Sequence, residues 1–227
     1  MEPAGSLPRL APTLPLKFVG GRASLDLLNT ADWPGSGPAL DRLASYERLL
    51  EWAERVRVLS ATSLARLRKR AAADPSASEA ALERARQFRT SLHRSVVALV
   101  SGRGVATALE RMTPFLREPL AHLVLEPARG GSAVDAGWSG LEDALDGPMW
   151  PVVWDAVQLL LSPEVERLRV CGGPDCGWVY VDHSRNGLRR WCEMETCGTR
   201  AKNRRRGRRP RQTRLSSGSS PARARDR

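Results

Sequence analysis

Cysteine is scarce in this 227-residue chain, and the first 170 positions contain none. The body of the protein therefore cannot be a disulfide-stapled scaffold. No apolar run approaches the roughly 18 residues that span a bilayer. The proline-containing start of the chain also lacks the apolar core of a secretory signal. These absences lead us to expect a cytoplasmic protein that has no membrane partner and keeps its thiols reduced.

Acidic residues are absent from positions 199 to 225, which hold eleven arginines and lysines. Because the whole chain has 36 basic and 25 acidic residues, this segment alone accounts for the formal net charge of +11. Charge concentrated in one segment favours a polyanionic partner such as nucleic acid. The simpler alternative is a solvated basic tail, and we expect residues 207–227 to be disordered.

Motifs typical of enzymes and nucleotide-binding proteins are absent as well. The Gly20-Gly21 pair fits neither of the phosphate-binding glycine patterns, and the sequence contains no H-E-x-x-H zinc motif. Asp26 and Asn29 could hydrogen-bond a small ligand or cap helices. We expect no catalytic residue and no enzymatic activity. A ligand-binding or enzymatic N-terminal domain, with the cysteine module as a structural appendage, is a competing hypothesis.

Apolar residues recur at helical spacing through most of the N-terminal two thirds of the chain. Asp41 could cap a helix that reaches about Val58, and further helices are predicted over residues 61–72 and 78–100. The stretch 149–161 is apolar on nearly all sides and predicts a buried helix. The N-terminal part of the chain is therefore expected to be mainly helical.

Residues 118–140 depart from the helical pattern. An apolar run over residues 123–125 and a glycine-containing turn over 129–132 predict a short β-hairpin there. The expected fold class is therefore mainly α (α+β). The expected units are a flexible lead over residues 1–16, a helical domain with a minor β-hairpin over 17–165, and a small zinc-ribbon-like module over 166–206.

The four cysteines lie in two close pairs with the spacing C-x4-C-x15-C-x4-C. Two pairs of thiolates joined by a loop can converge on one tetrahedral Zn²⁺, and four thiolates close the coordination shell of a structural site. Three alternatives remain. Two disulfides are disfavoured by the reducing compartment and the tight pairing, and a redox site is disfavoured by the absence of C-x-x-C. An iron–sulfur cluster is disfavoured because the spacing does not match its common motifs. With four thiols available, His183 is expected to be an exposed turn residue or a phosphate donor. The predicted ligands are Cys171, Cys176, Cys192 and Cys197.

Basic residues within and after the cysteine loop are the predicted nucleic-acid contacts. Arginine pairs with phosphates and can also bind guanine through two hydrogen bonds. Trp178 and Trp191 flank the cysteines, and they either form the core of the module or stack on bases, as an RNA-binding protein would require. The predicted contacts are Arg185, Arg189, Arg190, Arg200, Lys202, Arg204, Arg205 and Arg206.

Residues 169–202 read R-x-C-x4-C-x-W-V-Y-V-D-x-S-R-x3-R-R-W-C-x-M-x2-C-G-T-R-A-K, which resembles the CGNR zinc-finger family of bacterial proteins. Residues 18–30, followed by an amphipathic helix that ends near Trp52, resemble the ABATE domain that precedes this finger. The two resemblances together cover about residues 17–205. They imply that the four cysteines bind zinc, that the finger binds DNA, and that the protein is a transcription regulator, sometimes described as stress-induced.

One position departs from the tetrapeptide that gives the finger its name, which here reads Cys197-Gly198-Thr199-Arg200. Threonine stands in place of asparagine at position 199, and threonine can also cap the helix that follows. Zinc would fold the finger, because a segment of about forty residues has little core of its own. We therefore expect a zinc-stabilised regulator of double-stranded DNA. By analogy with two-domain regulators, its N-terminal domain would sense a ligand or form a homodimer.

Overall fold

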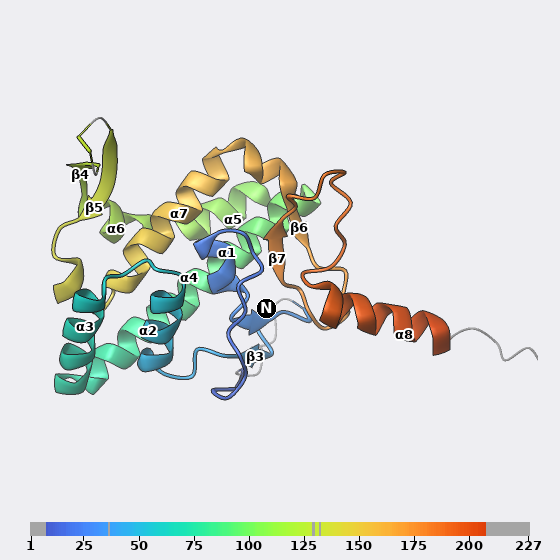
Figure 1. Cartoon of the computed structure of the whole chain (residues 1–227), viewed down its shortest axis with the longest axis horizontal. Helices are drawn as coiled ribbons and strands as arrows, with labels where there is room; N and C mark the ends of the chain where they lie inside the picture. The colour runs from blue at the N-terminus through green and yellow to red at the C-terminus, as the bar shows by residue number, and fades with distance from the viewer. Residues whose placement is uncertain (1–7, 36, 129, 132, 208–227) are drawn as a thin grey trace, which may run out of the picture.

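Helices form the body of the molecule on one side, and the C-terminal helix α8 (Thr199–Gly207) projects from the other side (Figure 1). The computed structural model describes residues 8–207 except Ser36, Arg129 and Ser132, with side chains as far as Arg204. Within this described part, no helix is both long enough and apolar enough to cross a membrane. The predicted fold class, mainly helical with small β-sheets, is confirmed.

Helix α4 (Pro75–Ser101) runs through the helical body (Figure 1). Asp74 caps its first turn by accepting a hydrogen bond from the backbone N–H of Ala77 at 2.9 Å. Gly102 ends the helix in the left-handed conformation, with φ at 68°. The helix predicted over residues 78–100 is therefore confirmed, and the aspartate cap lets it begin slightly earlier.

Helices α2 (Tyr46–Arg55) and α3 (Ala61–Ala73) pack against α4 and against each other. The side chains of Ser45 and Ser60 cap them by accepting backbone N–H groups of the first turns. The cap predicted at Asp41 is wrong, because this carboxylate is fully buried and forms an ion pair with α4. The helix therefore begins at Tyr46, after the nearer serine.

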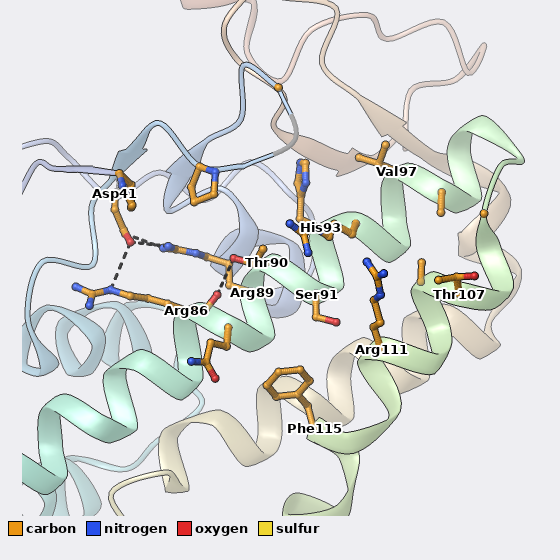
Figure 2. A pocket seen from close by; sticks show the side chains of 18 of the residues that line it. Asp41, Arg86, Arg89, Thr90, Ser91, His93, Val97, Thr107, Arg111 and Phe115 are labelled. Atoms are coloured by element: carbon orange, nitrogen blue, oxygen red, sulfur yellow. Dashed lines mark hydrogen bonds and ion pairs between the residues drawn. The ribbon is translucent and has the colours of Figure 1, made fainter. Parts of the chain in front are cut away.

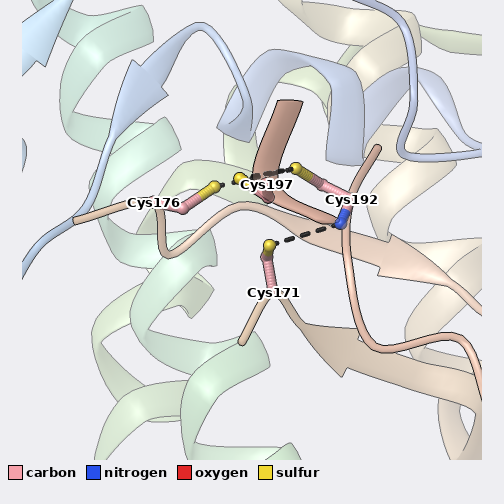
Figure 3. Close-up of side chains that lie close together, drawn as sticks. All are labelled: Cys171, Cys176, Cys192 and Cys197. Carbon is pink, nitrogen blue, oxygen red and sulfur yellow. Dashed lines mark hydrogen bonds between the residues drawn. The ribbon is translucent and has the colours of Figure 1, made fainter. Parts of the chain in front are cut away.

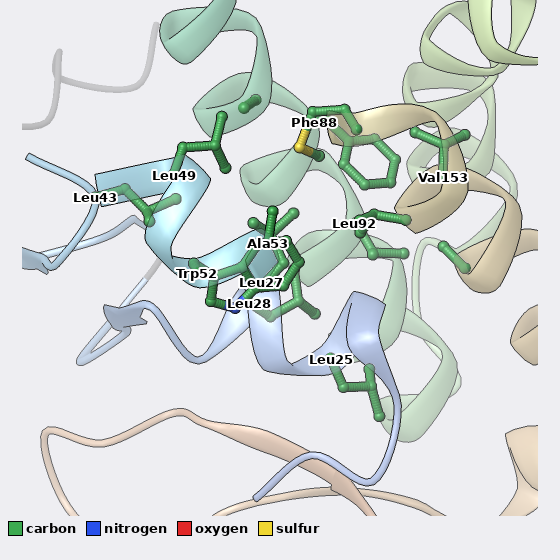
Figure 4. Packing of buried hydrophobic residues seen from close by; sticks show 14 of the residues in the cluster. Leu25, Leu27, Leu28, Leu43, Leu49, Trp52, Ala53, Phe88, Leu92 and Val153 are labelled. Atoms are coloured by element: carbon green, nitrogen blue, oxygen red, sulfur yellow. The ribbon is translucent and has the colours of Figure 1, made fainter. Parts of the chain in front are cut away.

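The hydrophobic core lies where α4 meets α1 (Ala23–Leu28) and α7 (Trp150–Leu161), with α2 beside them (Figure 4). Helix α7 is the predicted buried helix. Helix α1 was not predicted as a helix, because it has only six residues and no side-chain cap. Burial of a leucine contributes roughly 1.5–3 kcal/mol, and the fully buried leucines of α1 are Leu25, Leu27 and Leu28.

A β-hairpin stands at one end of the body (Figure 1), where the sequence predicts one. Its strands β4 (Leu123–Pro127) and β5 (Val134–Trp138) are antiparallel, with Leu123 opposite Trp138. Helix α5 lies beside α4. The elements that connect α4, the hairpin and the C-terminal segment are α5 (Val105–Met112), η1 (Thr113–Leu116), α6 (Arg117–Ala121), η2 (Leu141–Asp143), η3 (Gly147–Met149) and η4 (Pro163–Arg167).

A three-stranded sheet attaches the N-terminal segment to the body. The central strand β3 (Leu40–Asp41) pairs in parallel with β1 (Arg9–Leu10) and antiparallel with β2 (Ala31–Asp32). After β1, the backbone N–H of Ala11 donates to the carbonyl of Asp41 at 2.8 Å. The structure thus differs from the flexible lead predicted over residues 1–16, because these hydrogen bonds fix its second half. Residues 1–7 lie outside the described part.

The C-terminal segment begins with an antiparallel pair of strands, β6 (Leu168–Val170) and β7 (Val179–Val181). All three residues of β7 are fully buried, and Val179 and Val181 belong to the same apolar cluster as α1 and α4. A π-helical turn, η5 (Met194–Gly198), then leads into α8. Strand β7 is therefore packed into the core of the body, whereas the four cysteines lie in a separate buried cluster that includes Trp33 and Trp178.

Candidate metal centre and nucleic-acid interface

Strand β6 and the turn η5 bring the sulfur atoms of the four cysteines together (Figure 3). All four Sγ atoms lie within 4.8 Å of one another, and the Sγ of Cys192 lies 3.7 Å from those of Cys176 and Cys197. A disulfide bond would bring two sulfurs to about 2.05 Å, so these are free thiols. Zn–S bonds of about 2.3 Å in a tetrahedron would place the sulfurs about 3.8 Å apart. The cluster therefore fits one zinc ion.

The backbone around the cysteines is shaped to receive the sulfurs. The backbone N–H groups of Gly173 and Cys192 donate to the Sγ of Cys171 at 3.4 and 3.3 Å. A Cβ atom at Gly173 would lie 2.9 Å from the Sγ of Cys197, so a side chain at this position would displace the thiol. Backbone N–H groups directed at sulfur stabilise the thiolate, which is the form that binds metals.

Ionisation of one thiol among Cys171, Cys176 and Cys192 opposes ionisation of the other two. Hydrogen bonds from Cys176 and Cys192 lower the pKa of Cys171 well below its ordinary range. The same hydrogen bonds to Cys171 raise the pKa of Cys176 and of Cys192. One thiolate therefore disfavours the next, and a divalent cation would remove this conflict by neutralising the sulfurs together.

Arg189, a predicted nucleic-acid contact, is directed inward. Its guanidinium donates to the carbonyls of Cys192 and Trp191, the latter at 3.0 Å, and lies 4.0 Å from the centre of the Tyr180 ring. The Tyr180 hydroxyl donates back to the Arg189 carbonyl at 2.8 Å. The side chain is thus occupied in holding the second cysteine pair, which sequence reasoning did not foresee because the arginines of this loop look alike in sequence.

Other predicted contacts lie on the surface. Those with exposed side chains are Arg185, Arg190, Arg200, Lys202 and Arg204. The last three are on α8, which projects from the body (Figure 1) and contains no acidic residue. Arg205 and Arg206 continue this helix, and their side chains lie outside the described part. The predicted basic tail from residue 208 onward also lies outside it.

Thr199 begins α8 but does not cap it in the expected way. Its hydroxyl donates to the carbonyl of Met194 at 3.2 Å, five residues earlier in the chain. The side chain therefore closes the turn η5, and among the described residues no backbone N–H of α8 donates to it. The threonine that stands in place of asparagine thus lies at the junction between the cysteine cluster and the basic helix.

Trp178 is buried between the cysteine segment and the body. Its indole Nε1–H donates to Asp32 at 2.9 Å, and the guanidinium of Arg42 lies 5.1 Å from its ring centre. This tryptophan therefore forms core and is not available to stack on a base. Trp191 is partly exposed, packs beside the cysteines and has the Arg190 guanidinium 5.6 Å from its ring centre.

Asn29 joins the body to strand β7. Its side-chain N–H donates to the Val179 carbonyl at 2.9 Å, and its side-chain oxygen accepts the Val179 N–H at 2.9 Å. Nearby, the Val181 N–H donates to the Gly20 carbonyl, and the Gly20 N–H donates to Asp26 at 2.8 Å. These two polar side chains were predicted to bind a ligand or cap helices, and both instead hold backbone at the junction.

His93 contacts the loop that carries the second cysteine. Its Nε2 lies 3.0 Å from the Gly177 carbonyl, which can only accept, so this nitrogen carries the proton. The imidazole stacks on the Trp33 ring with ring centres 3.9 Å apart. The backbone N–H of Trp33 donates to the Cys176 carbonyl. Burial lowers the pKa of His93 to about 4, so the ring is neutral at physiological pH. Its sequence neighbours do not mark it, since a histidine on an apolar helix face usually only packs.

A buried ion pair fixes the sheet next to this junction. The guanidinium of Arg89, on α4, donates to both carboxylate oxygens of Asp41 at 2.7 and 2.5 Å, and both side chains are almost fully buried. Arg89 also donates to the Thr30 hydroxyl at 2.8 Å. The pair holds β3 in place against α4, and β2 beside it carries the aspartate that binds Trp178.

Two family models match the chain, with boundaries close to those of the cysteine segment and the helical body. The model described as "CGNR zinc finger" matches residues 167–210. The ABATE model, described as "Putative stress-induced transcription regulator", matches residues 21–163, which is more than half of the chain. No curated protein gave a match.

Proposed function

Because the chain belongs to the ABATE family and carries a CGNR zinc finger, we propose that it binds double-stranded DNA through helix α8 and regulates transcription. Helix α8 is the observation that carries the proposal. It projects from the metal centre, has no acidic residue and exposes Arg200, Lys202 and Arg204. Neither matched family is described as enzymatic, and the proposal assigns no catalytic residue.

We propose that one structural zinc ion holds the finger. The sulfur separations of 3.7 Å support this, since they match the edge of a zinc–thiolate tetrahedron. The ligands would be Cys171, Cys176, Cys192 and Cys197. Four thiolates leave no open position, so zinc would supply structure and no Lewis-acid chemistry. A thiolate site needs reduced cysteines, which fits a cytoplasmic protein.

The dimensions of α8 suit the major groove of DNA. An α-helix with its side chains is about 10–12 Å across, and the major groove is about 12 Å wide. Arg200 and Arg204 are four residues apart and so lie on one face of the helix. Arginines on this face would pair with phosphates and with guanine edges, whereas Arg189 would keep the helix attached to the cysteine cluster.

The first test recovers the DNA that the protein prefers. Zinc-loaded full-length protein is incubated with sheared genomic DNA at about 150 mM salt, a range in which phosphate contacts alone bind weakly, with total RNA as competitor. The recovered fragments are then sequenced. A shared short motif upstream of genes, retained in the presence of RNA, is the expected result. Fragments without a motif, or loss of DNA to RNA, would contradict the proposal and favour general nucleic-acid or RNA binding.

Charge reversal on α8 locates the contact. We expect Arg200→Glu with Arg204→Glu to weaken binding to the recovered motif at least about hundredfold, because two phosphate or base contacts become repulsive. The control is Arg117→Glu, which reverses an exposed charge on α6 in the body. Equal affinity of the α8 variant and the control would place the DNA contact elsewhere in the chain.

A further inference from the structure

A large cleft lies between α4 and α5 (Figure 2). Its volume is about 1060 Å³, at the upper end of the range for pockets that hold drug-sized ligands. Strand β1 and the loop before β3 contribute to its wall through Leu10 and Pro38. The proposed DNA contact uses no residue of this cleft.

The cleft carries a surplus of positive charge. Its two acids are already engaged, because Asp41 pairs with Arg89 and Glu83 pairs with Arg86 at 3.5 Å. Other arginines that line it have exposed side chains and form no ion pair within the described part of the chain. These arginines are Arg94, Arg103 and Arg111. An anion could therefore enter without competing with a resident carboxylate.

A polar group in the cleft also lacks a partner. The hydroxyl of Ser91 is buried and makes no hydrogen bond to any described residue. Figure 2 shows Ser91, from α4, and Arg111, from α5, directed into the same space between the helices. A buried hydroxyl without a partner carries an energetic cost, which an acceptor oxygen held by Arg111 would relieve.

The rest of the lining is largely apolar. Val97 is 37% exposed and Leu10 is 51% exposed, and both lie on the cleft wall. Phe115 closes the end of the cleft near Arg111 (Figure 2). Apolar surface beside unpaired arginines suits a molecule with an anionic head and an apolar body. A polyphosphate or nucleic acid would leave this apolar wall exposed.

We propose that the cleft binds an amphipathic organic anion of small-molecule size, with a carboxylate or similar head on Arg111 and Ser91 and an apolar body against Val97 and Phe115. The guanidinium can hold a carboxylate through two parallel hydrogen bonds. His93, which holds the Gly177 carbonyl of the finger, lines the same cleft. The bound anion would thus lie next to the junction between the body and the finger.

The test uses 1-anilinonaphthalene-8-sulfonate, an amphipathic anion whose fluorescence rises in apolar surroundings. Zinc-loaded full-length protein is titrated with this probe in the absence of DNA, so the result is independent of DNA binding. We expect saturable binding that octanoate reverses, whereas 1-octanol, which lacks the charge, reverses it at least about tenfold less effectively. Absence of saturable binding, or equal displacement by the alcohol, would overturn the proposal.

Two pairs of matched variants locate the probe. Arg111→Glu is compared with Arg117→Glu, which changes an exposed arginine outside the cleft. Val97→Trp, which fills the cleft, is compared with Val100→Trp, which is exposed on the same helix but does not line the cleft. We expect the first member of each pair to bind the probe at least about tenfold more weakly, and the second to behave as wild type. Equal binding within both pairs would overturn the proposal, and the thermal midpoints show whether each variant is folded.

Discussion

The side-chain amide of Asn29 pairs with both backbone polar groups of Val179, at 2.9 Å each, as a neighbouring β-strand would. The two residues are 150 positions apart, so this contact is long-range and ties the start of the chain to the finger. Both residues are fully buried. The finger is therefore held by the body as well as by its cysteines. Separation of β7 from the body would break both hydrogen bonds between Asn29 and the Val179 backbone.

Replacing Asn29 with alanine should strongly destabilise the folded protein. The change leaves the N–H and C=O of Val179 buried without partners, at about 1–3 kcal/mol for each group. We expect Asn29→Ala to lower the free energy of unfolding by about 2–5 kcal/mol, measured by urea denaturation with zinc present. Asn203→Ala, an exposed change on α8, should alter it by less than about 0.5 kcal/mol. Similar values for the two variants would mean that the junction does not stabilise the fold.

Gly177 and Gly187 form a matched pair that tests the close packing of the Gly177 loop against Trp33. Both are in the left-handed conformation, with φ at 60° and 64°. A Cβ at Gly177 would lie 2.3 Å from the carbonyl oxygen of Trp33, whereas nothing lies within 4 Å at Gly187. Both alanine variants bear the backbone cost of about 1–2 kcal/mol, and Gly177→Ala should lose about 1–3 kcal/mol more through overpacking. Equal unfolding free energies of the two variants would contradict this packing.

The buried pair of Asp41 and Arg89 should be costly to break. Asp41→Asn leaves the Arg89 charge buried without a counter-charge, and we expect a loss of about 3–5 kcal/mol in unfolding free energy. The control is Glu142→Gln, which removes a surface ion pair with Arg66 and should cost less than about 1 kcal/mol. A loss at Asp41 as small as the control's would show that water reaches Arg89.

Asp26 should make stability depend on pH. Burial raises its pKa from an ordinary 3.8 to about 6, so the folded state binds more protons than the unfolded state between these values. Stability from this group is therefore lost as the pH rises through 6. Between about pH 5 and 7.5, we expect the wild type to lose about 1 kcal/mol relative to Asp26→Asn. Asp135→Asn, an exposed control, should follow the wild type, and parallel pH curves for wild type and Asp26→Asn would contradict the assignment.

The metal centre is tested by the zinc content of purified protein. We expect one zinc ion per chain, measured by mass spectrometry of the metal, and none in Cys192→Ser, because three thiolates do not close the shell. His183→Ser should keep its zinc, since this histidine is 54% exposed in its side chain and lies outside the sulfur cluster. Zinc retained by Cys192→Ser, or lost from His183→Ser, would show that the ligand set is different.

Local signals explain what could be predicted from the sequence. The helix predicted over 61–72 is a local feature, and the structure caps it with the adjacent Ser60. The cysteine spacing likewise predicts the cluster, since each pair is close in sequence and the sulfurs have one chemistry to share. The hairpin at β4 and β5 is predicted by the apolar run over residues 123–125 and the glycine-containing turn that follows it.

Long-range pairing explains what could not be predicted. Asp41 is a residue type that commonly caps helices. It instead forms a buried ion pair with Arg89, which lies 48 positions away in the sequence. Arg189 is similar in sequence to its exposed neighbours, and only the position of the cysteine loop turns it inward. Trp178 could have formed core or bound a base, and the choice depends on Asp32, 146 positions earlier.

The DNA affinity of Cys192→Ser tests the central claim most directly. Zinc-loaded wild type, Cys192→Ser and His183→Ser are compared for binding to the DNA motif recovered from the genome, at one salt concentration. If zinc fixes the finger that positions α8, Cys192→Ser should bind at least about hundredfold more weakly, near the non-specific level, while His183→Ser binds as the wild type does. Wild-type affinity in Cys192→Ser would contradict the account, because DNA binding would then need neither the metal centre nor the helix that it holds.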